Sequence, residues 1–344
     1  MTSTPHDALF KSMFSEPEEA AAELRSVLPP KLAGRIDWAT LALVPGSFID
    51  EKLTERESDL LFEVRASDAR LKLHLLFEHQ STAPPLMAFR LLRYMVRIWE
   101  GEVAAEPERI TLTPIVPVVL HHSERGWTAA TSFGALLELG ELAGTGIESL
   151  VPEFSFVLDD VSAQSDDDIA RRLGSKVVRA TLGALREARR TRGDGPRLIR
   201  GLARLLLELR ASGRPEAYLR ILRYLLTVAA SDAPGPFLDA VSVEIGPQAK
   251  DEAMGLLDSM YERGRSEGLA HGKAEGKAEG EAAGRAEGEA AGRRATLGKQ
   301  LQLKFGLVPP WVIAALDAMD LAALDAASER ILVAARVEDV VPTE

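Results

Sequence analysis

The order of predicted elements gives this chain an α/β fold with a mixed sheet flanked by helices, followed by an all-α region. In the first 160 residues or so, a helical pattern precedes two strand-like runs, a further helix and another strand. From Ser165 onward the periodicity is helical only, and between Gly264 and Gly292 every fourth residue is glycine. These observations predict a sheet-containing N-terminal domain, an arginine-rich helical region, a long glycine-repeat helix or linker, and a small helical C-terminal domain. The corresponding divisions are 1–163, 164–262, 263–294 and 295–344.

The helices and strands of the first half follow from spacing and punctuation. Apolar residues at helical spacing predict a helix from residue 6, and Pro17 is expected to begin a second helix with Ser15 as its cap. A third helix is expected over 86–100. The apolar run 110–120 predicts a strand, and its two prolines indicate an edge position.

Further along, residues 154–158 predict another short strand. The acidic run that follows Ser165 has the composition of a metal cluster, but a serine followed by three aspartates is also typical of a helix cap and first turn. We favour the cap. Helices are expected over 165–192, 196–211 and 215–230.

Composition excludes several classes of protein. With no cysteine, the chain has no disulfide, no thiolate zinc site and no cysteine nucleophile. No window approaches the roughly 18 consecutive apolar residues of a membrane span, and the first residues lack the pattern of a secretory signal. We therefore expect a cytoplasmic protein without a membrane partner.

The net charge of −11 opposes a nucleic-acid partner at first sight, but the charge is unevenly distributed. Between residues 171 and 223, fifteen basic residues stand against four acidic ones, and nearly all the basic residues are arginine. Arginine suits bidentate contact with phosphate, whereas a set of helices with solvated arginine faces would give the same composition. The candidates for contact with a DNA backbone are Arg186, Arg189, Arg190, Arg197 and Arg200.

The candidate site lies in the stretch 51–80, which has two extended runs joined by a short turn at 67–69. Asp59 is on the first run, and Glu78 and Gln80 are on the second. Residues two apart on a strand point the same way, so Glu78 and Gln80 share a face, and pairing across the turn can bring Asp59 close to them. Two carboxylates and a polar group converging at a strand end indicate a metal site of the kind used by nucleases.

Phosphodiester hydrolysis needs neutralised charge and an activated water, which Mg²⁺ or Mn²⁺ held by a few carboxylates can supply. The backbone carbonyl of His79 is the candidate third ligand. Glu57 and Glu63 share a face with Asp59 by alternation and are candidate accessory groups, although solvated charges on a strand are the alternative. Glu78 ends a strongly apolar run, where a charge without a role would be costly.

The glycine repeat at 264–292 cannot form a stable isolated helix easily, because each helical glycine costs up to about 1 kcal/mol relative to alanine. Either a partner helix packs closely along the small residues, or the segment is a flexible spacer. We favour a helix that self-associates and holds the chain as a dimer.

Four blocks in order resemble the Rpn family of recombination-promoting nucleases, also called YhgA-like transposases. They are HDALFKSMFS from His6, LALVPGSFIDEKLTERESDLLFEV from Leu41, LHLLFEHQS from Leu73 and PLMAFRLLRYMVRIWE from Pro85. The resemblance spans roughly 5–127, and the glycine repeat with the ending LGKQLQLKFGLVPPWV resembles the tail that often follows this family.

The resemblance implies a PD-(D/E)XK nuclease fold, metal-dependent cleavage of DNA and a role in recombination. By position, Asp59 and Glu78 correspond to the two metal-binding acids of that superfamily, and Gln80 stands where a lysine positions the attacking water. Glutamine can orient a water by hydrogen bonding but carries no positive charge. Arg90, on the helix that follows, is a candidate to replace that charge.

Two hypotheses therefore stand. The first is a Mg²⁺-dependent DNA endonuclease, in which arginine-rich helices hold the DNA backbone and the glycine repeat brings two copies together. The second is a catalytically weak or inactive DNA-binding or assembly protein of transposase-like origin, in which Gln80 marks lost chemistry.

Overall fold

The computed structural model of the chain describes residues 4–44, 58–67, 69–78, 83–172, 174–229 and 234–341. The chain divides into two compact units, Met1–Ser259 and Met260–Glu344. Within the described residues, no helix combines the length and apolar character that a membrane crossing requires.

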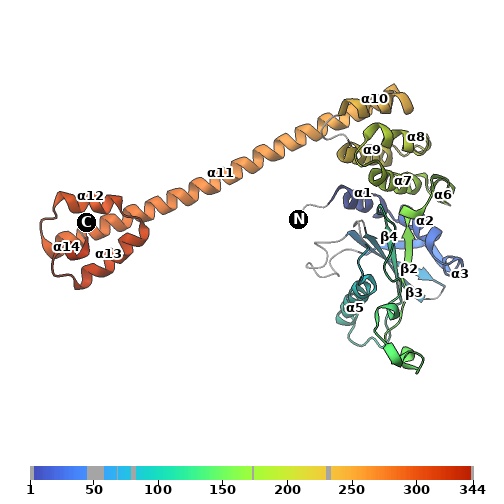
Figure 1. The fold of residues 1–344 in the computed structure, drawn as a ribbon, viewed down its shortest axis with the longest axis horizontal. Coiled ribbons are helices and arrows are strands. Elements are labelled where there is room, and N and C mark those ends of the chain that lie inside the picture. The colour runs from blue at the N-terminus through green and yellow to red at the C-terminus, as the bar shows by residue number, and fades with distance from the viewer. Residues whose placement is uncertain are drawn as a thin grey trace. The chain divides into compact units, whose positions relative to one another are not determined.

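A five-stranded mixed sheet lies at the centre of the first unit, with the strands in the order of the chain (Figure 1). The first three strands form an antiparallel meander, and β4 and β5 run parallel to β3. This confirms the predicted mixed α/β class. The strands are β1 Ile36–Leu43, β2 Ser58–Ala66, β3 Ala69–Glu78, β4 Ile115–His121 and β5 Val157–Asp160.

The predicted hairpin is β2 and β3. Its register runs without interruption from Ser58 opposite Phe77 to Ala66 opposite Ala69. Ser67, in the turn, has a φ of 55°, a left-handed conformation that is uncommon for a residue with a side chain. The alternation of apolar and polar residues along both runs is what makes this pairing readable from sequence.

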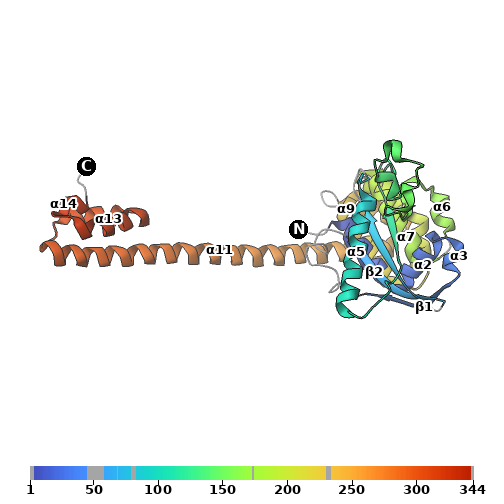
Figure 2. The same ribbon diagram turned by 90° about the horizontal axis from the view of Figure 1, so that it is seen from below.

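Helices cover both faces of the sheet. The helix α5 (Met87–Ala105) packs on one face, where Met87, Ala88 and Leu91 belong to the same buried apolar cluster as Val119 of β4. On the other face lie α1 (Pro5–Phe14) and α2 (Pro17–Val27), followed by the short α3 (Pro30–Ala33), as Figures 1 and 2 show.

Three local predictions about the first half of the chain were wrong. The strand expected over 110–120 begins only at Ile115, after the exposed residues Ile110 and Leu112. The cap of α2 is Glu16 and not Ser15, which instead ends α1. The strand β4 is central and not at an edge, since it lies between β3 and β5. The Lys72 N–H of β3 donates to the Pro114 carbonyl (2.9 Å). In a parallel ladder every second residue bonds the same neighbouring strand, so the backbone nitrogen of Pro117, three residues later, points away from β3. On the other side, pairing with β5 begins only at Val118, and the missing N–H of Pro117 therefore breaks no ladder bond.

The arginine-rich region is helical, as predicted, and belongs to the same compact unit as the sheet. The single helix expected over 165–192 was wrong: the backbone of Arg172 leaves the helical conformation, and Ser175 caps a new helix. Ser165 caps the first helix of this region through a reciprocal pair of hydrogen bonds with Asp168. This confirms the helix cap, which was favoured over the alternative of a metal cluster. The helices are α6 Asp166–Arg171, α7 Lys176–Thr191, α8 Gly195–Arg210, α9 Pro215–Ala229 and α10 Pro234–Glu244, and short 3₁₀ turns lie at Gly134–Leu136, Gly140–Leu142, Ile147–Ser149 and Val161–Ala163.

The glycine repeat lies within one helix, α11 (Pro247–Phe305). This confirms the helix, which was favoured over the alternative of a flexible spacer. All side chains from 261 to 289 are exposed, and a Cβ added at any repeat glycine would meet nothing within 4 Å. Self-association of this helix stays a prediction. The end of α11 joins α12 (Pro310–Ala318), α13 (Leu321–Val333) and α14 (Val337–Val340) around a small apolar core.

Candidate functional site

The hairpin places Asp59 and Glu78 at neighbouring positions on one face of the sheet. Asp59 lies opposite Leu76, two residues before Glu78, and paired residues share a face. Such diagonal positions are about 7 to 8 Å apart, a separation that two carboxylates can span to reach one ion. Their side chains lie outside the described part of the chain, as do Gln80, His79 and Glu57 altogether.

The first turns of α5 cover the row of the sheet that contains Asp59. In that row Leu76 is paired with Val119 of β4, and Val119 belongs to the same buried cluster as Met87 at the start of α5. Arg90, partly exposed, lies in the same first turns of α5. This location is compatible with its predicted role of supplying positive charge, and the role itself stays a prediction.

Glu63 shares the face of Asp59, as alternation predicted, but lies four residues along β2 and opposite Lys72. At about 3.3 Å per residue the two backbone positions are about 13 Å apart, too far for one ion. Glu63, Lys72 and Glu102 of α5 line a separate cavity of about 460 Å³.

In that cavity the Lys72 Nζ lies 2.6 Å from Glu102 Oε1, and both side chains are nearly buried. Burial would raise the pKa of Glu102, but the hydrogen bonds from Lys72 and Thr113 outweigh it, and the pKa falls below its ordinary value. This pair therefore fixes α5 to β3, with the Glu102 carboxylate held in its charged form.

The parallel strands end together, in a row formed by Glu78, His121 and Asp160. Sites of open α/β sheets lie at this carboxyl edge. His121 is buried and meets the Trp127 ring edge-on with centroids 5.0 Å apart. Asp160 Oδ2 accepts a hydrogen bond from the backbone N–H of Trp127 (2.8 Å). Sequence reasoning did not connect Asp160 with the hairpin, because the register of β4 with β5 has no local sequence signal.

On the face of the sheet opposite to His121, the end of β4 meets α1 and α9 through aromatic side chains at the same carboxyl edge. His122, 1% exposed, contacts the His6 ring of α1 with centroids 5.2 Å apart. The His6 Nδ1 and the Tyr224 hydroxyl of α9 share a 2.8 Å hydrogen bond. Burial raises the pKa of Tyr224 despite the opposing charge of Arg189, so the hydroxyl keeps its proton near neutral pH. The block beginning at His6 thus has a structural role beside the candidate site.

Beneath the sheet, α2 is fixed by a buried charge cluster that sequence reasoning missed. Arg172 donates to both oxygens of Glu23 (3.0 and 2.9 Å) and also bonds Asp159. Burial and the neighbouring charge of Asp159 raise the pKa of Glu23 well above its ordinary value. Two acids and one arginine therefore share this buried space.

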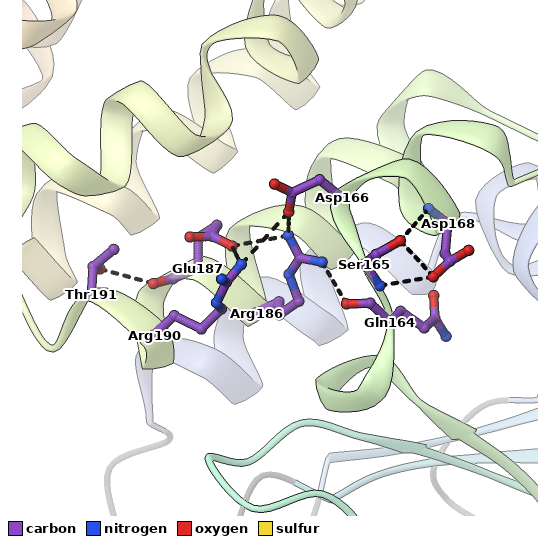
Figure 3. Close-up of polar contacts among 8 residues, drawn as sticks. All are labelled: Gln164, Ser165, Asp166, Asp168, Arg186, Glu187, Arg190 and Thr191. Atoms are coloured by element: carbon purple, nitrogen blue, oxygen red, sulfur yellow. Dashed lines mark hydrogen bonds and ion pairs between the residues drawn. The ribbon is translucent and has the colours of Figure 1, made fainter.

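Arg186, one of the predicted phosphate contacts, is only 5% exposed. Figure 3 shows the polar contacts of its side chain. It donates to Asp166, to Glu187 (2.9 Å) and to the Gln164 carbonyl (2.7 Å). Burial lowers the pKa of its guanidinium, an effect that the charge of Glu187 opposes. These bonds hold α6 against α7, and the phosphate contact predicted for Arg186 stays a prediction.

The other candidate arginines are more accessible. Arg190 is 57% exposed and lies 2.8 Å from Glu187. Arg197 and Arg200 are exposed on α8, and neither forms an ion pair with any side chain that the structure describes. Arg189 on α7 is partly buried. Arg197 and Arg200 are thus best suited to an external anion.

The described side chains contain no group of three or more histidine, aspartate or glutamate residues that could together hold a metal ion. That set does not include the side chains of Asp59 and Glu78. The donor types fit Mg²⁺ or Mn²⁺, because hard divalent cations take carboxylate and carbonyl oxygens.

The structure defines this protein as a mixed α/β protein with Asp59 and Glu78 on adjacent strands. Comparison with known proteins gives the family. Residues 4–217 match the model of the family described as "Putative transposase, YhgA-like". The match covers more than half of the chain, which therefore belongs to this family.

Curated relatives agree with this membership. The chain is 29% identical to Recombination-promoting nuclease RpnA of Escherichia coli (strain K12) over 270 residues, which cover 78% of this chain and 88% of the relative. It is 32% identical to Recombination-promoting nuclease RpnD of Escherichia coli O157:H7 over 173 residues, or 49% of this chain and 64% of the relative.

A third relative bears a different name. Inactive recombination-promoting nuclease-like protein RpnE of Escherichia coli (strain K12) is 34% identical over 168 residues, or 49% of this chain and 54% of that protein. Named nucleases and a named inactive protein are thus similar to this chain at comparable identity. No solved structure matches the chain.

Proposed function

We propose that the protein is a metal-dependent DNA endonuclease of the PD-(D/E)XK type that acts in recombination. The observation that carries this proposal is the register of β2 with β3, because it puts Asp59 and Glu78 at diagonal positions on one face. An acid on each of two neighbouring strands is the metal-binding pattern of that superfamily. Relatives named as nucleases support the same function.

In this proposal Asp59, Glu78 and the His79 carbonyl would hold Mg²⁺ or Mn²⁺. When bound, the ion acidifies a water and stabilises the charge that develops on the phosphate. Gln80 orients the attacking water by hydrogen bonding, since its amide can both donate and accept. Arg90 contributes positive charge beside the leaving group.

Arg197 and Arg200 contact the DNA backbone in this proposal, because they are exposed and not committed to described acids. The glycine repeat of α11 joins two copies, which lets two sites act on two strands. Its exposed glycines allow close approach of a second helix. Deletion of 264–294 should therefore lower the mass measured by light scattering, and an unchanged mass refutes this part of the proposal.

The second candidate is a DNA-binding or assembly protein with little or no cleavage. Gln80 in place of lysine favours it, and so does the similarity to a relative named inactive. The same arginines would then bind DNA without hydrolysis.

A plasmid-nicking assay in Mg²⁺ or Mn²⁺ separates the two candidates. The endonuclease should convert supercoiled plasmid to nicked circles, and Asp59→Asn or Glu78→Gln should abolish this while leaving DNA binding intact. Asp37→Asn is the matched control, because it removes an exposed acid from neighbouring β1. DNA binding without cleavage by the wild type favours the second candidate, and cleavage that survives both substitutions refutes the assigned site.

A further inference from the structure

The helix α5 has a second apolar surface besides the one that faces the sheet. Its buried residues, such as Leu91 and Ile98, pack inward. On the outer side, Phe89, Val96 and Val103 are 46%, 41% and 44% exposed. Figures 1 and 2 show no other described helix of the same unit packed against α5 on the side away from the sheet, which agrees with the exposure of these three residues.

The spacing of these residues is that of a helix–helix seam. Phe89, Val96 and Val103 are seven residues apart, and the half-buried Leu92 and Trp99 lie three residues after the first two. The result is the alternating three-and-four pattern of a coiled coil over two full heptads. Single exposed apolar residues are ordinary, but a continuous seam of this period indicates a packing surface.

The neighbouring segment extends the same surface. The Trp99 Nε1 donates to the Thr113 carbonyl (2.8 Å), which places residues 110–113 beside the second half of α5. There, Ile110 and Leu112 are 96% and 49% exposed. Together, five residues form the α5 seam: Phe89, Leu92, Val96, Trp99 and Val103.

The charges beside the α5 seam are self-complementary. Arg93 lies three residues before Val96 and Glu100 four residues after it, both on the solvent side of the seam. A twofold axis at Val96 brings Arg93 of one copy to within one residue, about 1.5 Å along the axis, of Glu100 in the other copy. Flanking charges of this kind set partner and orientation more than affinity.

A parallel pairing offers no such complement. Heptad geometry then places Arg93 across from Ala88, and Glu100 across from Met95, both of which are buried against the sheet. The antiparallel arrangement is therefore the one that this charge pattern fits.

We propose that a second copy of this chain packs on the α5 seam, with the two α5 helices antiparallel and a twofold axis at Val96. Each candidate site lies at the N-terminal end of its own α5, so the two sites lie at opposite ends of this interface. This interface does not depend on nuclease activity and is separate from the one proposed for the glycine repeat.

The chain contains no cysteine, which permits a direct test by single-cysteine crosslinking of the full-length protein. Under mild oxidation, Val96→Cys should form a disulfide-linked dimer because both copies meet on the axis. The matched control is Val103→Cys, equally exposed on the same helix. Its two copies would be about 20 Å apart, far beyond the roughly 4.4–6.8 Å Cα separation of a disulfide.

A mixture of Phe89→Cys and Val103→Cys proteins should form the mixed disulfide, because these positions face each other across the axis. Equal crosslinking of the Val96→Cys and Val103→Cys proteins indicates random collision, tethering through another segment or a parallel pairing, and overturns the proposal. So does a failure of Val96→Cys to crosslink, which is the result expected if an unrelated protein occupies the seam.

Solution mass gives an independent readout. Val96→Glu should lower the mass measured by sedimentation velocity below that of the wild type at the same concentration, because it removes this interface and leaves any contact through the glycine repeat in place. Val243→Glu, which charges an exposed valine of α10, should leave the mass unchanged. Circular dichroism must show both variants folded, and equal masses for the two variants contradict the interface.

Discussion

Arg172 gives the sharpest stability prediction, because its neighbour Arg171 is a matched control. Arg172→Ala removes the cation that bonds Glu23 and Asp159, whose side chains are 1% and 4% exposed. Arg171 pairs with Asp167, and those side chains are 78% and 68% exposed. The two substitutions delete the same atoms at adjacent positions with opposite burial.

The expected losses of stability differ by several kcal/mol. Breaking a buried pair by removing one partner costs about 3–5 kcal/mol, because the remaining charge stays desolvated. An exposed pair contributes about 0–1 kcal/mol. Since a domain of this kind is stable by about 5–15 kcal/mol, Arg172→Ala should remove a large part of the stability of the first unit.

Urea denaturation followed by far-UV circular dichroism and tryptophan fluorescence measures both losses. Trp38 lines a cavity of about 870 Å³ with Arg172 and Asp159, so its emission should report the change locally. Lower pH should partly rescue Arg172→Ala, because protonation removes the uncompensated charge. Equal losses for Arg171→Ala and Arg172→Ala, or a loss that does not depend on pH, would refute the reasoning.

Three further predictions concern charge and catalysis. Burial raises the pKa of Glu23, so its contribution to stability is full below the ordinary glutamate pKa of 4.5 and is lost as pH rises through the raised value. Glu23→Gln should therefore flatten the decline in melting temperature with rising pH. A pH profile of the melting temperature that does not change contradicts this prediction. Replacing Arg197 and Arg200 by alanine should reduce the salt slope of DNA binding by about 0.9 for each phosphate that is no longer neutralised, while Arg204→Ala, which removes a partner of Glu208, should change it less. Gln80→Lys should raise the plasmid-nicking rate and Gln80→Ala should lower it, since lysine restores the charge that glutamine lacks; equal rates for all three proteins exclude a role for this position.

The parts of the fold that follow from local patterns could be predicted from sequence. Alternation along 58–78 predicts the hairpin and the shared face of Asp59 and Glu63, and Ser165 with its aspartates predicts a helix cap. Each of these depends on residues within a few positions of one another, where strand and helix periods are visible.

The arginine-rich region shows what local patterns cannot supply. Between 171 and 223 the charge count favours a basic surface, yet Arg172 pairs with Glu23, Arg192 with Glu124 and Arg214 with Glu19. These acids lie far away in the sequence, so a count within one segment does not include them. The same holds for Asp160, which joins the row of Glu78 only through the register of β4 with β5.

The central claim is that Asp59 and Glu78 hold one divalent ion, and a Mn²⁺ titration followed by electron paramagnetic resonance tests it most directly. The wild type should bind Mn²⁺ at a site that Mg²⁺ displaces, and Asp59→Asn and Glu78→Gln should each remove that binding. Because both acids serve the same ion, the double variant should bind no more weakly than either single variant. Undiminished Mn²⁺ binding in the single variants, or none in the wild type, contradicts the account.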